Sequence, residues 1–211
     1  MQTWTPSDSC NHVLQSIRAM DAPILTTNFD DLIPKCLELD LHRIKGTRFT
    51  HYYPWSSYYA EKELEKPADG FGVWYMHGMI RYHTSIKLGL SSYMGNVQRA
   101  RNIIHGKRGI YRKGYTNSSW SGSSTWLDLL FHKNLVIIGL GLEEVEVFVR
   151  WLLLERAKYF KRYPERRMKG FYIDIENHIP GITGKEMFLK AVGIEPIALE
   201  TYDEIYHDLW L

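Results

Sequence analysis

Apolar side chains along this chain follow two different periods, one typical of strands and one typical of helices. Short runs that are mostly apolar or β-branched predict buried strands at residues 23–27, 73–76, 135–138, 171–175 and 194–199. Apolar residues spaced by three or four positions predict helices at residues 7–20, 28–39, 91–104, 126–131, 143–160, 185–192 and 202–210. Strands that alternate with helices in this way indicate an α/β fold, with a mostly parallel sheet covered by helices on both faces.

Two stretches lack either period and read as irregular insertions. Residues 42–72 are rich in Tyr, Ser, Pro, Lys and Glu, and we expect one short helix there, near residues 58–64. Residues 105–122 form a basic stretch rich in glycine and serine. The chain contains no internal repeat, so we expect residues 1–211 to form a single domain.

Composition narrows the class of protein. The 211 residues are 45% hydrophobic and 24% charged, and the net charge of +2 creates no global field that would select nucleic acid or an anionic membrane. The longest apolar runs fall far short of the roughly 20 residues of a membrane helix. No secretory signal is visible, and Cys10 and Cys36 have no metal-ligand spacing. We therefore expect a cytoplasmic protein without a structural metal and without a membrane partner.

Candidate chemistry lies just after the predicted strands. In an open parallel sheet, ligands bind outside the carboxyl ends of the strands, and those ends meet at one edge. The residues at these positions are Asn28 and Asp30, His77 and Gly78, the turn from Gly139 to Gly141, and Asp174 and Glu176. We expect the fold to gather them on one rim.

Each of these residues also has a purely structural interpretation. His77 can act as a general base near neutral pH or be a hydrogen-bonded core residue, and Asn28 and Asp30 are frequent helix caps. The glycine turn at residues 139–141 can approach a ribose or adenine, or can serve close packing. It fits a phosphate poorly, because Glu144 replaces the third glycine of a dinucleotide-binding fingerprint.

The basic stretch offers a separate hypothesis. Positive charges interleaved with aromatic rings can grip single-stranded nucleic acid, although a solvated loop is the more frequent outcome. The residues concerned are Lys107, Arg108, Tyr111, Arg112, Lys113, Tyr115 and Trp120.

Several of these segments resemble sirtuin-like domains of the bacterial, defence-associated type. Residues 26–30, Thr-Thr-Asn-Phe-Asp, resemble the family's strand-end signature, and residues 76–78 resemble its His-Gly motif. Residues 88–93 are similar to the segment that follows this motif in the family. Residues 135–148 resemble the family's strand and glycine turn, which are followed by an acidic position and a helix. Residues 193–197 resemble a late strand of the family.

This collinear similarity implies a Rossmann-like fold and NAD as a substrate that is cleaved between nicotinamide and ribose. It further implies that Asn28 holds the nicotinamide ribose or an attacking water, and that His77 accepts a proton. Thr27, Asp30, Gly139, Gly141 and Asp174 are then the expected NAD-binding residues. The resemblance covers roughly residues 8–205.

The chain departs from the family pattern in two places. Sirtuin deacylases carry two cysteine pairs that bind zinc, and this chain has two isolated cysteines, so NAD hydrolysis is favoured over protein deacetylation. The family also opens with a strand and a glycine-rich phosphate loop, whereas the first glycine here is Gly46. We therefore expect a sheet that lacks its first strand and exposes unpaired backbone edges. A fragment of a longer protein, a degenerate member and a domain completed by another chain all fit this departure.

Two functions follow. The first is an NAD hydrolase used as an antiphage defence effector, working as a homo-oligomer or with additional domains. The alternative is a module that senses NAD or ADP-ribose without turnover.

Overall fold

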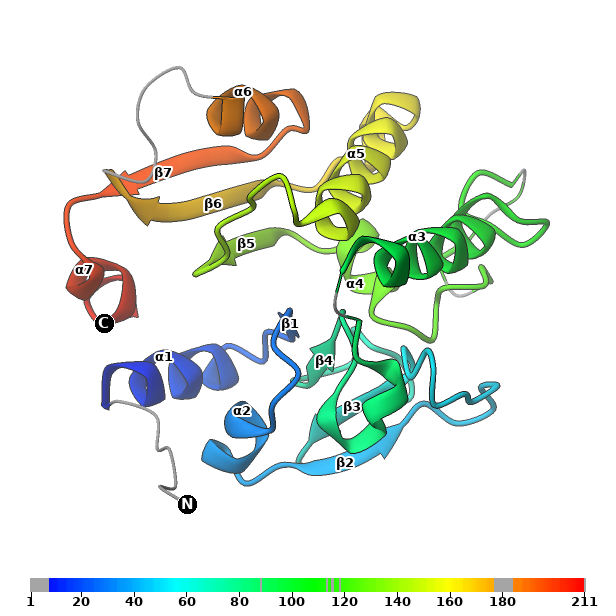
Figure 1. Cartoon of the computed structure of the whole chain (residues 1–211), viewed down its shortest axis with the longest axis horizontal. Helices are drawn as coiled ribbons and strands as arrows, with labels where there is room; N and C mark the ends of the chain where they lie inside the picture. Colours follow the sequence, from blue (N-terminus) through cyan, green and yellow to red (C-terminus); the bar gives the residue numbers. More distant parts are fainter. Residues whose placement is uncertain are drawn as a thin grey trace.

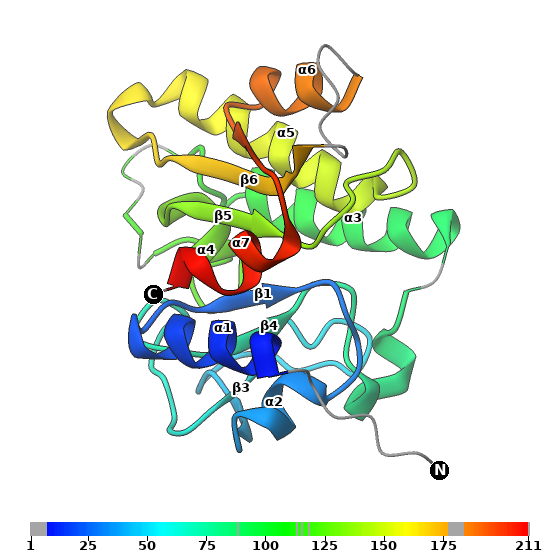
Figure 2. The same ribbon diagram turned by 90° about the vertical axis from the view of Figure 1, so that its left-hand side faces the viewer.

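The computed structural model describes residues 8–87, 89–112, 114, 116–117, 119–176 and 184–210 (Figures 1 and 2). Leu88, Lys113 and Tyr115, which contributed to the expectations above, lie outside the described residues. The α-helices are α1 (Asp8–Ala19), α2 (Leu32–Cys36), α3 (Leu90–His105), α4 (Leu127–His132), α5 (Val147–Arg162), α6 (Gly184–Ala191) and α7 (Tyr202–Tyr206). The strands are β1 (Ile24–Thr26), β2 (Asp40–Arg43), β3 (Ser57–Ala60), β4 (Val73–Tyr75), β5 (Leu135–Ile138), β6 (Gly170–Ile175) and β7 (Glu195–Leu199). The 3₁₀ helices are η1 (Ile80–Ser85), η2 (Pro164–Arg166) and η4 (Asp208–Trp210).

The strands form two sheets. One sheet has the order β1-β4-β3-β2, in which β1 and β4 are parallel and the other pairs are antiparallel. The other has the order β5-β6-β7 and is parallel throughout. Parallel pairs therefore predominate and helices pack around both sheets, which confirms the α/β, Rossmann-like expectation.

The expected irregular insertion at residues 42–72 is partly a β-structure, and the short helix near residues 58–64 was a wrong prediction. Residues 57–60 form β3, which pairs with β2 on one side and with β4 on the other. Tyr58 is fully buried, and its ring stacks on Trp74 at a centroid distance of 4.5 Å. This cross-strand aromatic contact stabilises β3 through residues that are distant in sequence, so local periodicity did not reveal it.

The edges at which the two sheets approach each other are unpaired within the described part of the chain. Ile24 donates its N–H to Gly72, and Thr26 accepts from Met76, so the backbone of the intervening Leu25 faces away from β4. On the other sheet, β5 pairs only with β6, and Val136 is 51% exposed. Figure 2 shows β1 and β5 as the nearest strands of the two sheets. β1 and β5 thus each have one side without a strand partner in the described part of the chain, and the loss of the family's first strand stays a prediction.

Helices and a shared core hold the two sheets together. The larger apolar cluster extends from Trp74 in β4 through Trp126 and Phe148 to Tyr172 in β6. A smaller cluster lies between α1 and the first sheet, and α1 also packs on α7, where the rings of His12 and His207 lie 5.4 Å apart. Among the described residues, no helix combines the length and apolar character needed to cross a membrane.

Candidate functional site

Asn28 and His77 follow two neighbouring parallel strands at the same sheet edge. Thr26 of β1 lies in register with Tyr75 of β4, and each candidate residue comes two positions later. Hydrogen bonds continue beyond the strands: Met76 donates its N–H to the Thr26 carbonyl at 3.0 Å. The amide of Asn28 is exposed, and its backbone N–H donates to the Thr26 hydroxyl. The topology thus positions Asn28 and His77 on adjacent strand ends.

Asp30 has a local structural role in this segment. Its carboxylate accepts a hydrogen bond from the Leu32 N–H at 3.0 Å, where α2 begins. Its carbonyl oxygen accepts from the Tyr75 hydroxyl at 2.7 Å, which ties the segment to β4. Thr27, between the strand and Asn28, is half-buried. These contacts make the turn after β1 a fixed platform for the exposed Asn28 side chain.

The imidazole of His77 is buried without a hydrogen-bond partner. The residue is 3% exposed, and the rings of Tyr93 and Phe148 lie with centroids 5.1 Å and 5.9 Å from its own. Neither ring nitrogen has a hydrogen-bond partner among the described residues. Burial lowers the pKa of His77, and the nearby carboxylate of Glu146 acts in the opposite direction. The ring is therefore neutral near pH 7, with one nitrogen able to accept a proton.

Glu146 is the site residue that sequence reasoning missed. Its Oε2 lies 3.3 Å from Nε2 of His77, outside hydrogen-bond geometry, and is itself a buried oxygen without a partner among the described residues. The sequence pattern predicts a helix from residue 143, but α5 begins at Val147, and Glu146 forms no side-chain capping bond. The signal available in the sequence was an acidic residue shortly after a strand and a glycine turn.

Gly78 fixes the backbone immediately after His77. Its φ is +98°, and a Cβ at this position would lie 2.2 Å from the Ser85 carbonyl oxygen. The segment folds back here, since Lys87 donates its N–H to the His77 carbonyl at 3.1 Å. The glycine of the His-Gly motif thus has a steric function, because any side chain would displace the segment that returns to the His77 backbone at Lys87.

We expect Gly78→Ala to lower the free energy of unfolding by about 2–4 kcal/mol, because it adds backbone strain to a backbone clash. Gly89→Ala is the matched control, since Gly89 has a φ of +99° and nothing within 4 Å of its ideal Cβ. Urea denaturation measures the free energy of unfolding of both variants. The loss in Gly89→Ala gives the cost of backbone strain, and the additional loss in Gly78→Ala gives the cost of the steric clash. Equal losses in the two variants would contradict a steric role for Gly78.

The second sheet contributes the glycine turn and Asp174. Gly139 has a φ of +66°, and Gly141 follows one residue after Leu140. The Tyr172 hydroxyl lies 2.8 Å from the Leu140 carbonyl oxygen and 2.9 Å from an Asp174 carboxylate oxygen. The structure therefore places Gly139, Gly141 and Asp174 together at the ends of β5 and β6.

Asp174 also interacts with a cation, since the Lys185 ammonium group lies 3.4 Å from its carboxylate. The pKa of Tyr172 is raised well above its ordinary range, first by burial and then by the Asp174 carboxylate. The contact between His77 and Glu146 is the direct link from this half of the site to the first sheet, because Glu146 follows β5 and His77 follows β4.

Two cavities of the protein lie away from these residues. One, of about 570 Å³, lies between α3 and α5 and is lined by Arg101, His105 and Glu155 among others. The second, of about 420 Å³, lies between α5 and α6. The predicted site residues line neither of them. Among the described residues, no group of three or more His, Cys, Asp or Glu side chains is arranged to hold a metal ion.

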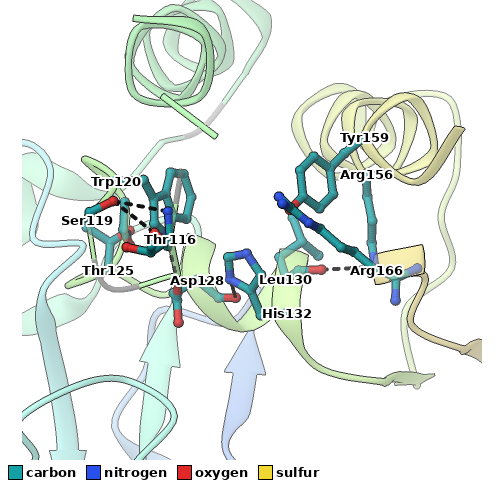
Figure 3. A network of polar contacts seen from close by, with 11 residues as sticks. Thr116, Ser119, Trp120, Thr125, Asp128, Leu130, His132, Arg156, Tyr159 and Arg166 are labelled. Atoms are coloured by element: carbon teal, nitrogen blue, oxygen red, sulfur yellow. Dashed lines mark hydrogen bonds and ion pairs between the residues drawn. The ribbon is translucent and has the colours of Figure 1, made fainter. Parts of the chain in front are cut away.

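The two aromatic residues of the basic stretch that the structure describes, Tyr111 and Trp120, pack inward. Trp120 is 2% exposed, and its indole N–H donates to Asp128 at 2.8 Å, while Nδ1 of His132 lies 2.9 Å from the same oxygen (Figure 3). Tyr111 stacks on His105, with ring planes 6° apart. Both rings therefore pack against other side chains of the protein. Stacking on the bases of single-stranded nucleic acid would require the rings to be exposed at the surface.

Comparison with known proteins identifies the family of this chain. A family model for the SIR2-like domain matches residues 22–197, a range that includes Asn28, His77, Glu146 and Asp174. Searches among curated proteins and among solved structures found no match. Strand-end residues from both sheets lie inside the matched range, and the range covers most of the chain. This chain therefore belongs to the family of SIR2-like domains, whose members use NAD as a substrate.

Proposed function

We propose that this domain hydrolyses NAD at the bond between nicotinamide and ribose, with Asn28 and His77 as its catalytic residues. The observation that carries the proposal is the buried imidazole of His77, whose two nitrogens lack partners in the described part of the chain. Leaving a buried polar group unpaired costs about 1–3 kcal/mol. Such groups are rare in folded proteins and are often kept for catalysis. Membership of the SIR2-like family supports NAD as the substrate.

The proposed reaction needs a base and no general acid. The bond from ribose C1′ to the pyridinium nitrogen breaks, and its electron pair leaves with neutral nicotinamide. The oxygen of a water molecule bonds to C1′, and the proton of that water passes to His77. The products are nicotinamide, ADP-ribose and one proton. Burial lowers the pKa of His77, so the imidazole is free to accept this proton at neutral pH.

Asn28 complements this base from the neighbouring strand end. Its exposed carboxamide carries both donors and an acceptor, and it can hold a ribose hydroxyl or the water. We assign Thr27 and Asp30 to the same end of the substrate. We assign Gly139, Gly141 and Asp174, which lie together after β5 and β6, to a ribose or the adenine.

The purified protein is incubated with NAD and free nicotinamide is measured, with the Asn28→Ala, His77→Ala double variant as the background. We expect release by the unmodified chain and none by the double variant. Equal release from both proteins would contradict the proposal. Saturable NAD binding by calorimetry without nicotinamide release would instead support the sensing module.

We also propose that NAD hydrolysis by this domain serves antiphage defence. The supporting observation is the Thr-Thr-Asn-Phe-Asp segment at residues 26–30, which is similar to the defence-associated branch. Bacteria carrying the wild-type gene should lose cellular NAD after phage infection, and bacteria carrying the double variant should keep it. Unchanged NAD and unchanged phage plating in both strains would rule out this role.

A further inference from the structure

Glu146 and His77 form a buried pair that joins the two halves of the molecule. Glu146 follows β5 and His77 follows β4, and Oε2 of Glu146 lies 3.3 Å from Nε2 of His77. The side chain of His77 is 4% exposed and that of Glu146 is 24% exposed, so water screens their interaction only partly. Both facing atoms lack a hydrogen-bond partner among the described residues. A small rotation of either side chain would bring these two atoms into a hydrogen bond with each other.

Among the residues that the structure describes, Glu146 supplies the carboxylate that faces this imidazole. Tyr93 from α3 and Phe148 from α5 present their rings to His77. Burial, followed by the Glu146 carboxylate, raises the pKa of the Tyr93 hydroxyl, so Tyr93 stays neutral. The other acids of the same turn, Glu143 and Glu144, are exposed.

We propose that Glu146 is a positioning residue that accepts the Nε2–H of neutral His77 and thereby leaves Nδ1 as the proton-accepting nitrogen. A neutral imidazole carries its proton on one nitrogen, and the group bonded to that nitrogen determines which one. A carboxylate that holds one nitrogen also fixes the ring plane and stabilises the imidazolium that forms after proton transfer. This inference rests on the proposed NAD hydrolysis and adds to it the residue that prepares the base.

Glu146→Gln removes the charge while keeping the size of the side chain. Glu144→Gln is the matched control, because it removes the same charge from an exposed position in the same turn. The first measurement is kcat/KM for nicotinamide release as a function of pH. The second is the pair of ¹⁵N chemical shifts of His77, identified by comparison with His77→Leu, which report the tautomer without requiring turnover.

In the wild type and in Glu144→Gln, we expect His77 to carry its proton on Nε2. In Glu146→Gln, we expect a changed tautomer population and a kcat/KM lower by about tenfold or more, which is part of the 10²–10⁴-fold that a general base contributes. The carboxylate of Glu146 raises the pKa of His77, so its removal should move the acid limb of the pH profile to lower pH.

The outcomes separate this inference from the proposed function. If the wild type releases nicotinamide but Glu146→Gln keeps the wild-type pH profile and tautomer, the role of Glu146 is wrong and NAD hydrolysis stands. If the wild type releases none, NAD hydrolysis fails, and the ¹⁵N shifts still decide whether Glu146 orients His77. Unchanged shifts in Glu146→Gln overturn the positioning role in either case.

Discussion

His77→Leu is expected to stabilise this protein and to abolish its NAD cleavage. His77 is 3% exposed, and its Nδ1 has no partner among the described residues even when Glu146 accepts the Nε2–H, so the wild-type protein bears the cost of burying an unpaired polar atom. The Glu146 side chain is 24% exposed, so its carboxylate can turn to water once the imidazole is gone. Leucine has a similar size and no polar atom, and we expect the free energy of unfolding to rise by about 1–2 kcal/mol. Loss of the general base should lower the rate of nicotinamide release by about 10²–10⁴-fold. Urea denaturation and the nicotinamide assay measure the two effects.

His132→Leu serves as the comparison, because it makes the same change at a partly buried histidine that has a partner. Nδ1 of His132 lies 2.9 Å from Asp128, and its side chain is 9% exposed. This variant should be destabilised and should keep its specific activity. If His77→Leu were equally destabilised and still released nicotinamide, His77 would be an ordinary core residue.

The second large effect concerns stability, at Arg156. This side chain of α5 is 1% exposed and donates to four carbonyl groups (Figure 3 shows the bond to Leu130). The accepting carbonyls belong to Leu130, Lys133, Met168 and Lys169, at distances of 2.9, 3.4, 3.2 and 2.9 Å. Two of these carbonyls lie at the end of α4 and two just before β6, so one guanidinium joins α5 to both segments.

Burial lowers the pKa of Arg156 to about 10, so the guanidinium is still charged at neutral pH. Arg156→Met would remove the donors and leave several buried carbonyls without partners, at about 1–3 kcal/mol each. Relief of the desolvated charge offsets part of that loss, and we expect the free energy of unfolding to fall by about 3 kcal/mol. Denaturant unfolding followed by circular dichroism provides the measurement.

Lys161→Met on the same helix is the control, because Lys161 is exposed and its loss should change stability by less than about 0.5 kcal/mol. If Arg156→Met changed the free energy of unfolding as little as Lys161→Met does, water would have replaced the lost hydrogen bonds. In that case α4 and β6 would not depend on Arg156 for their attachment to α5.

Several elements could be predicted from sequence because their stabilising contacts have a local signature. The apolar run of residues 135–138 is typical of a parallel-sheet strand, so the pattern alone indicates the strand that the fold contains there, although Val136 is exposed in the structure. The placement of Asn28 and His77 at strand ends followed in the same way, since residues after two parallel strands share one sheet edge. The sequence does not show whether a polar residue at that edge serves catalysis or packing, because neither role has a local signature.

The sequence by itself determined the α/β class, most helix and strand positions, and the candidate pair Asn28 and His77. Only the tertiary structure decided that residues 57–60 form a strand, because its stability comes from pairing with β2 and β4 and from Tyr58 stacking on Trp74. Only the tertiary structure placed Glu146 beside His77. These two residues are 69 positions apart in the chain, and no periodicity in a linear pattern records a contact made between two separate sheets.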